Sequence, residues 1–102
     1  MELSNQFVLG GSICFPPKLT RSPAGVSHLR FALEHRSLQH EAGLQRRSYV
    51  RIQVVMSGDD APQWANELNV GMQVQVSGFL NRIEDKNGVA KLVIHAQQLV
   101  KI

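Results

Sequence analysis

The sequence predicts a single all-β domain with one short helix, on three observations. Runs in which apolar and polar residues alternate recur along the 102-residue chain, and this period of two is typical of half-buried strands. Gly, Pro and Asn-Gly turn signals separate these runs. Only the stretch 57–68 shows a helical period instead. A chain of this length fits one domain, which we take as residues 1–102.

Five strands are expected from the alternating runs. The first run contains the pair Gly10-Gly11, which predicts a bulge or a sharp bend. The stretch 15–27 holds three prolines and one glycine and is expected to form a long loop. The polar stretch 37–45 is expected to be a connection. The expected strands cover residues 7–14, 28–36, 46–57, 69–83 and 89–102.

The expected helix lies within 57–68, between the third and fourth strands. Asp60 can act as its N-cap, and Pro62 suits its first turn. Trp64 and Leu68 stand four residues apart, as neighbours on one helix face do. This stretch therefore interrupts the strands with one short helix.

The last two strands are expected to form a hairpin at Asn87-Gly88, the strongest hairpin signal in the chain. Five strands with one short helix between strands 3 and 4 fit a five-stranded Greek-key barrel, the OB-fold. A small β-sandwich is the competing architecture. The bend signals at Gly10-Gly11 and at Gly78 favour the closed barrel.

The strand 46–57 has two faces of different chemistry. One face is cationic and aromatic, with Arg47, Tyr49 and Arg51. The other face is apolar and is expected to fill the barrel: Val50, Ile52 and Val54. Cations bind phosphates and aromatic rings stack on bases, so the first face predicts binding of single-stranded nucleic acid. A solvated basic face with an edge tyrosine is the alternative interpretation.

Positive charge is concentrated in the same part of the chain. Residues 18–51 contain seven Lys and Arg and two acidic residues, a net charge of +5, whereas the whole chain carries +3. Such a segment is typical of a polyanion-binding surface. Arg30 and Arg36 stand beside the cationic face on the preceding strand. Loop residues can extend the face: Lys18 and Arg21 in the first loop, and Arg82, Lys86 and Lys91 in or beside the last hairpin.

The residues do not indicate an enzyme, a metal site or a cofactor site. Asp59-Asp60 are expected to form a turn and a helix cap rather than a catalytic acid pair. The four histidines lack the spacing of zinc ligands: His28, His35, His40 and His95. We therefore expect no catalytic residues, no bound metal and no cofactor.

The compartment is expected to be the cytoplasm. The N-terminal residues show no secretory signal, and no apolar run approaches the ~18 residues of a membrane span. The single cysteine, Cys14, is expected to be a buried thiol in a reducing environment.

Four stretches of the chain carry a family resemblance: LEHRSLQHEAGLQR (33–46), SPAG (22–25), SGFL (77–80) and KNG (86–88). They resemble the primosomal replication protein N family, also called PriB, and the similarity runs from about Asn5 to Ile102. The resemblance implies an OB barrel that forms a homodimer, related to bacterial single-stranded-DNA-binding proteins. It also implies binding of single-stranded DNA, of the restart helicase PriA and of DnaT, without catalytic activity.

The DNA-contacting positions of the family match this chain unevenly. Four residues match basic positions: Arg36, Arg46, Lys86 and Lys91. Tyr49 stands where relatives have Trp, which keeps a smaller stacking ring, and Leu44 stands where an aromatic Phe can occur. Glu84 replaces a Lys and so replaces attraction by repulsion. Arg47 and Arg51 add charge where relatives can be neutral.

Three other functions remain as alternatives. The first is a general single-stranded-DNA-binding protein. By family resemblance such proteins end in a flexible acidic tail, whereas this sequence ends in LVKI. An RNA-binding OB or cold-shock module would present several clustered aromatic residues, and only Tyr49 is evident. The third alternative is a protein-interaction barrel whose basic face docks an acidic partner, with weak or no DNA binding.

Overall fold

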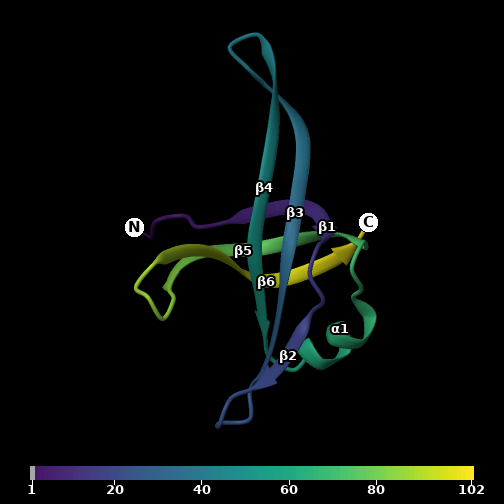
Figure 1. Cartoon of the computed structure of the whole chain (residues 1–102), viewed down its shortest axis with the longest axis vertical. Helices are drawn as coiled ribbons and strands as arrows, with labels where there is room; N and C mark the ends of the chain where they lie inside the picture. Colours follow the sequence, from purple (N-terminus) through teal and green to yellow (C-terminus); the bar gives the residue numbers. More distant parts are fainter. Residues whose placement is uncertain (1) are drawn as a thin grey trace.

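Six strands and one helix build the protein, in a computed structural model that describes residues 2–102 (Figure 1). The elements are β1 (Phe7–Ile13), β2 (Lys18–Arg21), β3 (Ser27–Glu41), β4 (Leu44–Ser57), α1 (Ala61–Glu67), β5 (Gln73–Glu84) and β6 (Ala90–Lys101). The strand order is β1-β5-β6-β4-β3-β2, and β1 also pairs with β3. The pairing of β1 with β3 closes five of the strands into a barrel, which confirms the predicted fold class.

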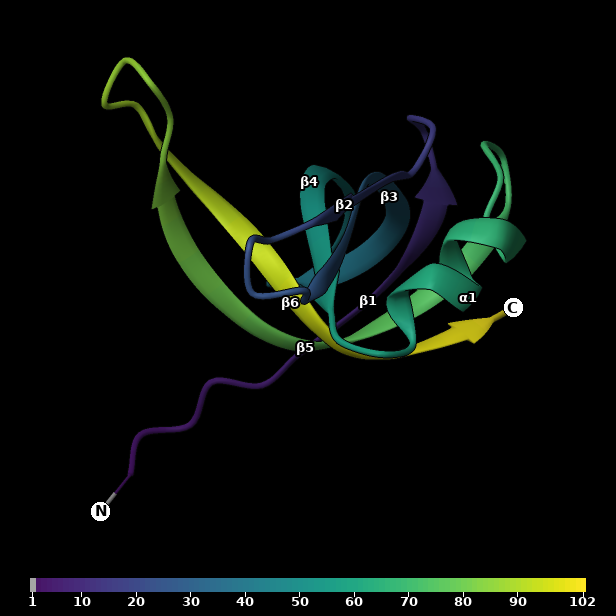
Figure 2. The same ribbon diagram turned by 90° about the horizontal axis from the view of Figure 1, so that it is seen from below.

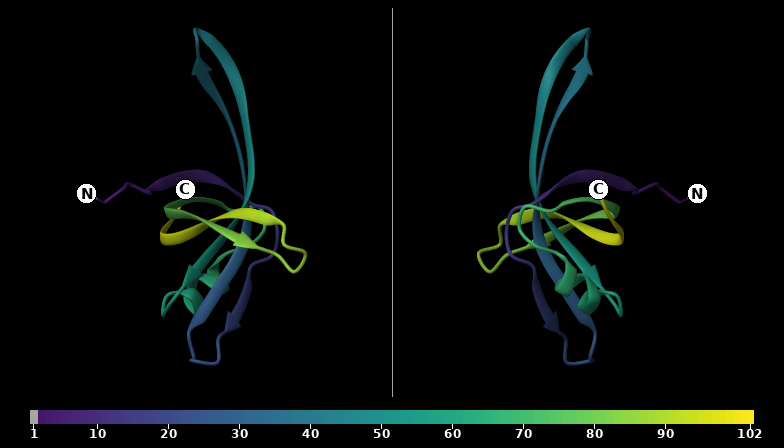
Figure 3. Two further views of the ribbon diagram at one scale, coloured as in Figure 1. Left: turned by 90° about the vertical axis from the view of Figure 1, so that its left-hand side faces the viewer. Right: turned by 90° about the vertical axis from the view of Figure 1, so that its right-hand side faces the viewer.

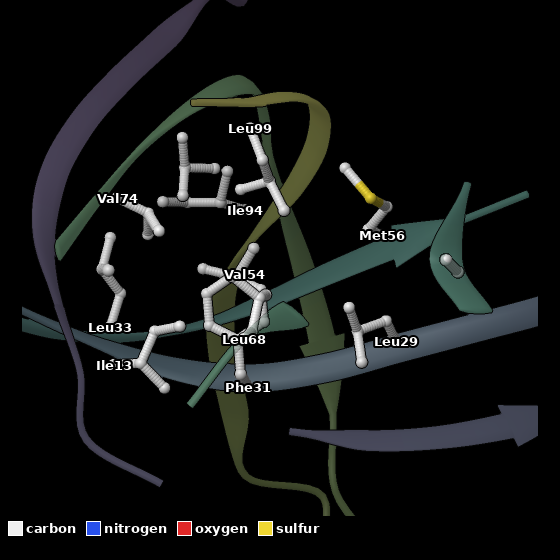
Figure 4. Packing of buried hydrophobic residues seen from close by; sticks show 12 residues of the cluster. Ile13, Leu29, Phe31, Leu33, Val54, Met56, Leu68, Val74, Ile94 and Leu99 are labelled. Carbon is white, nitrogen blue, oxygen red and sulfur yellow. The ribbon is translucent and has the colours of Figure 1, made fainter. Parts of the chain in front are cut away.

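The barrel interior is filled by the alternate apolar residues of its strands (Figure 4). On β3, Leu29, Phe31 and Leu33 are buried, as their parity predicts. The other large side chains of the cluster are Ile13, Val54, Met56, Leu68, Val74, Val76, Ile94 and Leu99. On the apolar face of β4, Val54 is fully buried and Ile52 packs at the edge of the cluster, but Val50 is only half-buried.

The helix α1 lies between β4 and β5 in the chain, where the sequence predicts it, and packs against β3 and β2. Asp60 occupies the N-cap position, but its side chain makes no capping hydrogen bond. The residue contributes through its carbonyl oxygen, which accepts a bond from the Trp64 backbone N–H at 3.1 Å. Ala61 and Leu68 are buried at the two ends of the helix. Within residues 2–102, no helix is long and apolar enough to cross a membrane.

Two glycines allow the close approaches that barrel closure needs. A Cβ atom at Gly78 would collide with the carbonyl oxygen of His95, at the register shift between Ser77 and Gly78. A Cβ atom at Gly11 would likewise meet the carbonyl oxygen of Glu34. The predicted kink at Gly78 is thus a β-bulge. The register of β1 with β5 is continuous through Gly10-Gly11, so that pair forms no bulge and instead admits the β3 backbone.

The expected connection at 37–45 is wrong. β3 continues to Glu41 and β4 begins at Leu44, so only Ala42 and Gly43 form the turn, both with positive φ (53° and 75°). Two such residues are typical of a type I′ hairpin turn. Residues 36–49 form a two-stranded ribbon, here called the arm, which projects from the barrel (Figures 1 and 3). Because both faces of the arm meet solvent, its sequence lacks the alternation that marks a strand.

The expected loop at 15–27 also contains a strand. β2 pairs with β3 from Lys18–Arg30 to Arg21–Ser27, and only residues 22–26 form the turn. β5 and β6 form a curved pair whose own hairpin projects beyond the barrel (Figure 2). Its turn lies at Asn87-Gly88, as the sequence predicts, and the Gly88 N–H donates to the Asp85 carbonyl oxygen at 3.0 Å.

Candidate nucleic-acid interface

The pairing of β3 with β4 determines which side chains share a face. Arg36 is paired with Tyr49, and Leu38 with Arg47. Directly opposed residues of an antiparallel pair point to the same side of the sheet. Arg51 lies two residues beyond Tyr49 and therefore shares this face. The structure thus brings Arg36, Arg47, Tyr49 and Arg51 together on one surface, as their parity predicts.

Tyr49 is held in place by two charged neighbours. Its hydroxyl donates to Glu34 Oε2 at 3.2 Å, and the Arg36 guanidinium lies over its ring, 5.0 Å from the centroid. Arg36 Nε in turn donates to Glu34 Oε1 at 3.1 Å. The residue as a whole remains 54% exposed. Tyr49 is therefore a positioned platform, but one with a carboxylate beside it, which would repel a phosphate.

Below the arm, an open groove of about 830 Å³ borders β4, and residues from both faces of that strand line it, among them Arg51, Val50 and Ile52. Four cations line it, here called the groove cations: Lys18, Arg30, Arg51 and Lys91. No Asp or Glu of the described residues lines the groove. None of the groove cations pairs with a carboxylate within 4 Å among residues 2–102. The groove lining therefore carries a net positive charge, and the Glu34 carboxylate stands beside it, opposite Arg51 in the β3–β4 pair.

Phe15 is a second aromatic residue on this surface, and the sequence alone does not reveal it. It lies in the turn between β1 and β2, lines the groove and is 54% exposed. The Arg51 guanidinium lies over its ring, 4.8 Å from the centroid. The pKa of Arg51 is raised above its ordinary value, chiefly by the neighbouring Cys14 side chain and further by the charges of Tyr49 and Glu34. Cys14 itself is half-buried rather than buried. The signal that the sequence offers is the place of this aromatic residue, three residues before Lys18 in a stretch that contains prolines.

The remaining candidate cations lie apart from the groove, and some are already paired. Arg46 pairs with Glu41 at 3.9 Å near the tip of the arm, and Arg82 pairs with Glu84 at 3.2 Å. Glu84 therefore neutralises a neighbouring cation within the protein. Arg21 lies at the end of β2, toward another hairpin tip.

Lys86 lies in the β5–β6 turn, which the Asp85 carboxylate organises. This carboxylate accepts bonds from the Val89 and Asn87 backbone N–H groups, at 2.9 and 2.8 Å. These two bonds, that of Val89 first, hold the pKa of Asp85 below its ordinary value. Lys86 is thus carried on an ordered turn.

The fold of this barrel is shared by solved single-stranded-DNA-binding proteins. The sequence model described as "another single-strand binding protein family" matches residues 5–98. The wild-type single-stranded DNA binding protein from Thermus aquaticus superimposes with a TM-score of 0.82, at 22% identity, over 97% of this chain and 50% of that one. The fold and the sequence match define the class as an OB-fold protein of the single-strand-binding type.

Curated relatives give the particular branch of this class. Replication restart protein PriB from Yersinia pestis is 40% identical over 97% of this chain and 93% of its own length. The protein priB from Ralstonia solanacearum superimposes with a TM-score of 0.79, at 21% identity, over 97% of this chain and 98% of that one. The chain belongs to the PriB family of replication restart proteins, and the resemblance seen in the sequence is confirmed.

Proposed function

We propose that this protein binds single-stranded DNA as an accessory of replication restart. The observation that carries the proposal is the cationic and aromatic surface that runs from the arm into the groove, where four cations form no ion pair with a carboxylate of residues 2–102. Single strands are held by such combinations of cations and stacking rings. The names of the PriB relatives and of the matching family support the same function.

The proposed mechanism separates charge from stacking. Phosphates of a single strand contact the groove cations and Arg47, and each contact releases counterions. A base stacks on the open side of Tyr49, whose other side is covered by Arg36. Because this is binding chemistry, the protein acts without a catalytic step or a cofactor. We place this work in the cytoplasm, where replication forks are restarted.

The partners that we propose are the PriA helicase and DnaT, which the family resemblance implies. The β5–β6 hairpin is a suitable contact because it projects from the barrel on an ordered turn and carries mixed charge, with Glu84 and Lys86. The protein would then hold single-stranded DNA on one surface while a hairpin remains available to a partner.

We also propose that the protein forms a homodimer through β1. This strand pairs with β5 over Phe7–Ser12 but with β3 only at Ser12 and Ile13. In the described part of the chain, the edge of residues 7–11 that faces away from β5 therefore has no partner strand. Unpaired strand edges are templates for pairing with another chain, and a second copy of β1 would satisfy this one.

A protein-interaction module is the second candidate function. It is favoured by the partners that the protein already supplies to Tyr49, Arg36, Arg46 and Arg82. A face whose outer cations are neutralised binds DNA less strongly, and could instead dock an acidic protein. In that case DNA binding would be weak or absent, and helicase binding would be the main activity.

Fluorescence anisotropy of a labelled oligo-dT of about 30 nucleotides, titrated at several salt concentrations, tests the proposal. Arg47→Ala should flatten the slope of log K against log salt by up to ~0.7, the value per phosphate neutralised on single strands. Tyr49→Ala should weaken binding by about 1–3 kcal/mol and leave the slope unchanged. Lys101→Ala is the matched control, since Lys101 pairs with Glu67 away from the groove.

The two candidate functions predict different results. If the wild type binds oligo-dT and both variants respond as stated, the face is a DNA platform. If the wild type fails to bind, or if Arg47→Ala and Tyr49→Ala behave like Lys101→Ala, the DNA-binding proposal falls and the protein-interaction module takes its place.

A further inference from the structure

The basic face has an outer end near the arm, at Tyr49 and Arg36, and an inner end at the groove. The two ends differ in whether their cations form ion pairs with carboxylates. At the outer end, Glu34 accepts hydrogen bonds from both Tyr49 and Arg36. At the inner end, Phe15 and Arg51 lie together in a groove that no acidic residue of the described chain lines. Glu34 stands directly opposite Arg51 in the β3–β4 pair, so its carboxylate borders the groove at that edge. The attraction for an anionic ligand therefore comes mainly from the other three groove cations, Lys18, Arg30 and Lys91.

Two of the groove cations stand in a position that costs stability unless an anion is present. Lys18 and Arg30 are directly opposed in the β2–β3 pair, and both are exposed. Like charges directly opposite one another on a sheet are destabilising. A phosphate between them would turn this repulsion into attraction. The pair is therefore suited to a phosphate rather than to the stability of the free protein.

The aromatic ring beside these cations is arranged to stack. The Arg51 guanidinium lies over the Phe15 ring at 4.8 Å, and the residue is still half exposed. The residue that precedes Phe15, Cys14, is anchored to β3, because its thiol donates to the Ala32 carbonyl oxygen at 3.5 Å. The ring is thus held by a cation while much of it faces the solvent of the groove.

We infer that Phe15 and Arg51 form a nucleotide-binding subsite, in which one base of single-stranded DNA stacks on Phe15 while its neighbouring phosphates bind the groove cations. This inference rests on the proposed DNA-binding function and specifies where a base is held. It places the main stacking contact on the barrel wall, with Tyr49 on the arm as the second contact.

Oligonucleotides with and without bases separate stacking from charge. Oligo-dT of about 30 nucleotides and an abasic strand of the same length are titrated with the wild type and with Phe15→Ala. Phe15→Ala should weaken binding of oligo-dT by about 5- to 150-fold, with an unchanged salt slope. On the abasic strand the same variant should bind within about twofold of the wild type, since no base remains to stack. Val70→Ala, which also shortens an exposed apolar side chain, is the control and should change neither affinity.

A second variant reports on contact directly. Phe15→Trp keeps a stacking ring, so it should bind at least as tightly as the wild type, and its added fluorescence should be quenched by oligo-dT but not by the abasic strand. The native Trp64 does not line the groove, so the wild type supplies the background signal.

The results distinguish this inference from the proposal on which it rests. If the wild type binds oligo-dT but Phe15→Ala binds within twofold of it, or if Phe15→Trp is not quenched, the subsite is absent although DNA binding stands. If the wild type does not bind oligo-dT at all, both fall together. An equal loss on the abasic strand would also overturn the subsite, because the loss would then not depend on a base.

Discussion

Glu34 is a carboxylate within an otherwise basic face, and its charge opposes the binding of a polyanion there. It accepts hydrogen bonds from Tyr49 and Arg36 and so neutralises the charge of Arg36. Gln in its place keeps hydrogen-bond acceptance without the charge. We therefore expect Glu34 to limit affinity for a polyanion while it positions the ring of Tyr49.

Glu34→Gln should strengthen binding of oligo-dT by about three- to tenfold at low salt and steepen the salt slope by up to ~0.7, because one more cation becomes available to phosphate. Anisotropy titrations over a salt series measure both quantities. Glu67→Gln removes the same charge beside Lys101, away from the groove, and serves as the control. Weaker binding by Glu34→Gln would mean that the position of Tyr49 matters more than the charge.

Gly78 and Gly10 form a matched pair for testing barrel closure. A Cβ atom at Gly78 would collide with the His95 carbonyl oxygen, whereas one at Gly10 would make ordinary van der Waals contacts, with the end of Ile102 at 3.6 Å and the Val74 carbonyl oxygen at 3.9 Å. Gly78→Ala should lower the free energy of unfolding by about 1–3 kcal/mol or more, and Gly10→Ala should change it by less than about 0.5 kcal/mol. Urea denaturation followed by circular dichroism gives both values, and equal values would show that the bulge can relax.

The arm depends on its turn, because it has no barrel core beneath it. Ala42 adopts φ of 53° in that turn, a left-handed conformation that costs a residue with a Cβ about 1–2 kcal/mol. Asn tolerates this conformation far better, and Asn-Gly is the preferred pair in a type I′ turn. The arm of this protein is thus less stable than it would be with a residue that favours positive φ at position 42.

Ala42→Asn should therefore slow hydrogen exchange of backbone amides in the arm by about three- to fivefold, as the local opening equilibrium shifts. Exchange measured by NMR or mass spectrometry compares the arm with barrel strands such as β5, which should not change. Faster exchange in the arm of the variant would contradict the assigned turn type.

The β5–β6 hairpin has a pH dependence that follows from Asp85. Its pKa is lowered in the folded protein by hydrogen bonds from the Val89 and Asn87 N–H groups. The ionised Asp85 carboxylate therefore stabilises the turn at pH values above its unfolded pKa, near 3.8. This stabilisation is lost as the pH falls through the lower pKa of the folded protein. NMR titration of Asp85 should give a midpoint below 3.8. Asp85→Asn should remove the titration and loosen the turn, and a midpoint at or above 3.8 would contradict the hydrogen-bonded turn.

The proposed dimer can be tested on the open edge of β1. The Gly10 carbonyl faces away from β5, where it contacts His35 Nδ1 at 2.6 Å, so the backbone groups of Val8 face the same open edge. Val8→Pro removes one backbone N–H group from this edge and should convert the dimer to a monomer. The measured mass should then fall from twice 11.4 kDa to 11.4 kDa. Light scattering after size exclusion measures the mass, with Val8→Ala as control. A monomeric wild type would refute the dimer.

What the sequence predicts well is what the barrel core imposes. The parity of Leu29, Phe31 and Leu33, and of Val54, follows from a wall with one buried face. The parity of Tyr49 and Arg51 follows because β4 keeps its register as it leaves the barrel. The turn at Asn87-Gly88 depends on local chemistry alone.

What the sequence does not predict depends on contacts between distant residues or on surfaces without a core. The arm lacks a buried face, so its strands resemble a polar connection. The bond from Tyr49 to Glu34 requires the β3–β4 register, and the contact of Phe15 with Arg51 requires a turn to be placed against a strand of the barrel wall. The residues of the proposed subsite could therefore be seen only once the chain was folded.

The arm has a thermodynamic consequence of its own. An isolated two-stranded ribbon is marginally stable in water, and this one extends a molecule whose principal dimensions are 51 × 33 × 33 Å. A strand of nucleic acid lying along the arm would supply the covering layer that the barrel gives to the rest of β3 and β4. The free energy of binding then includes the cost of ordering the arm. Binding should be accompanied by an unfavourable entropy, and this entropy should be smaller in a variant whose free arm is already more rigid.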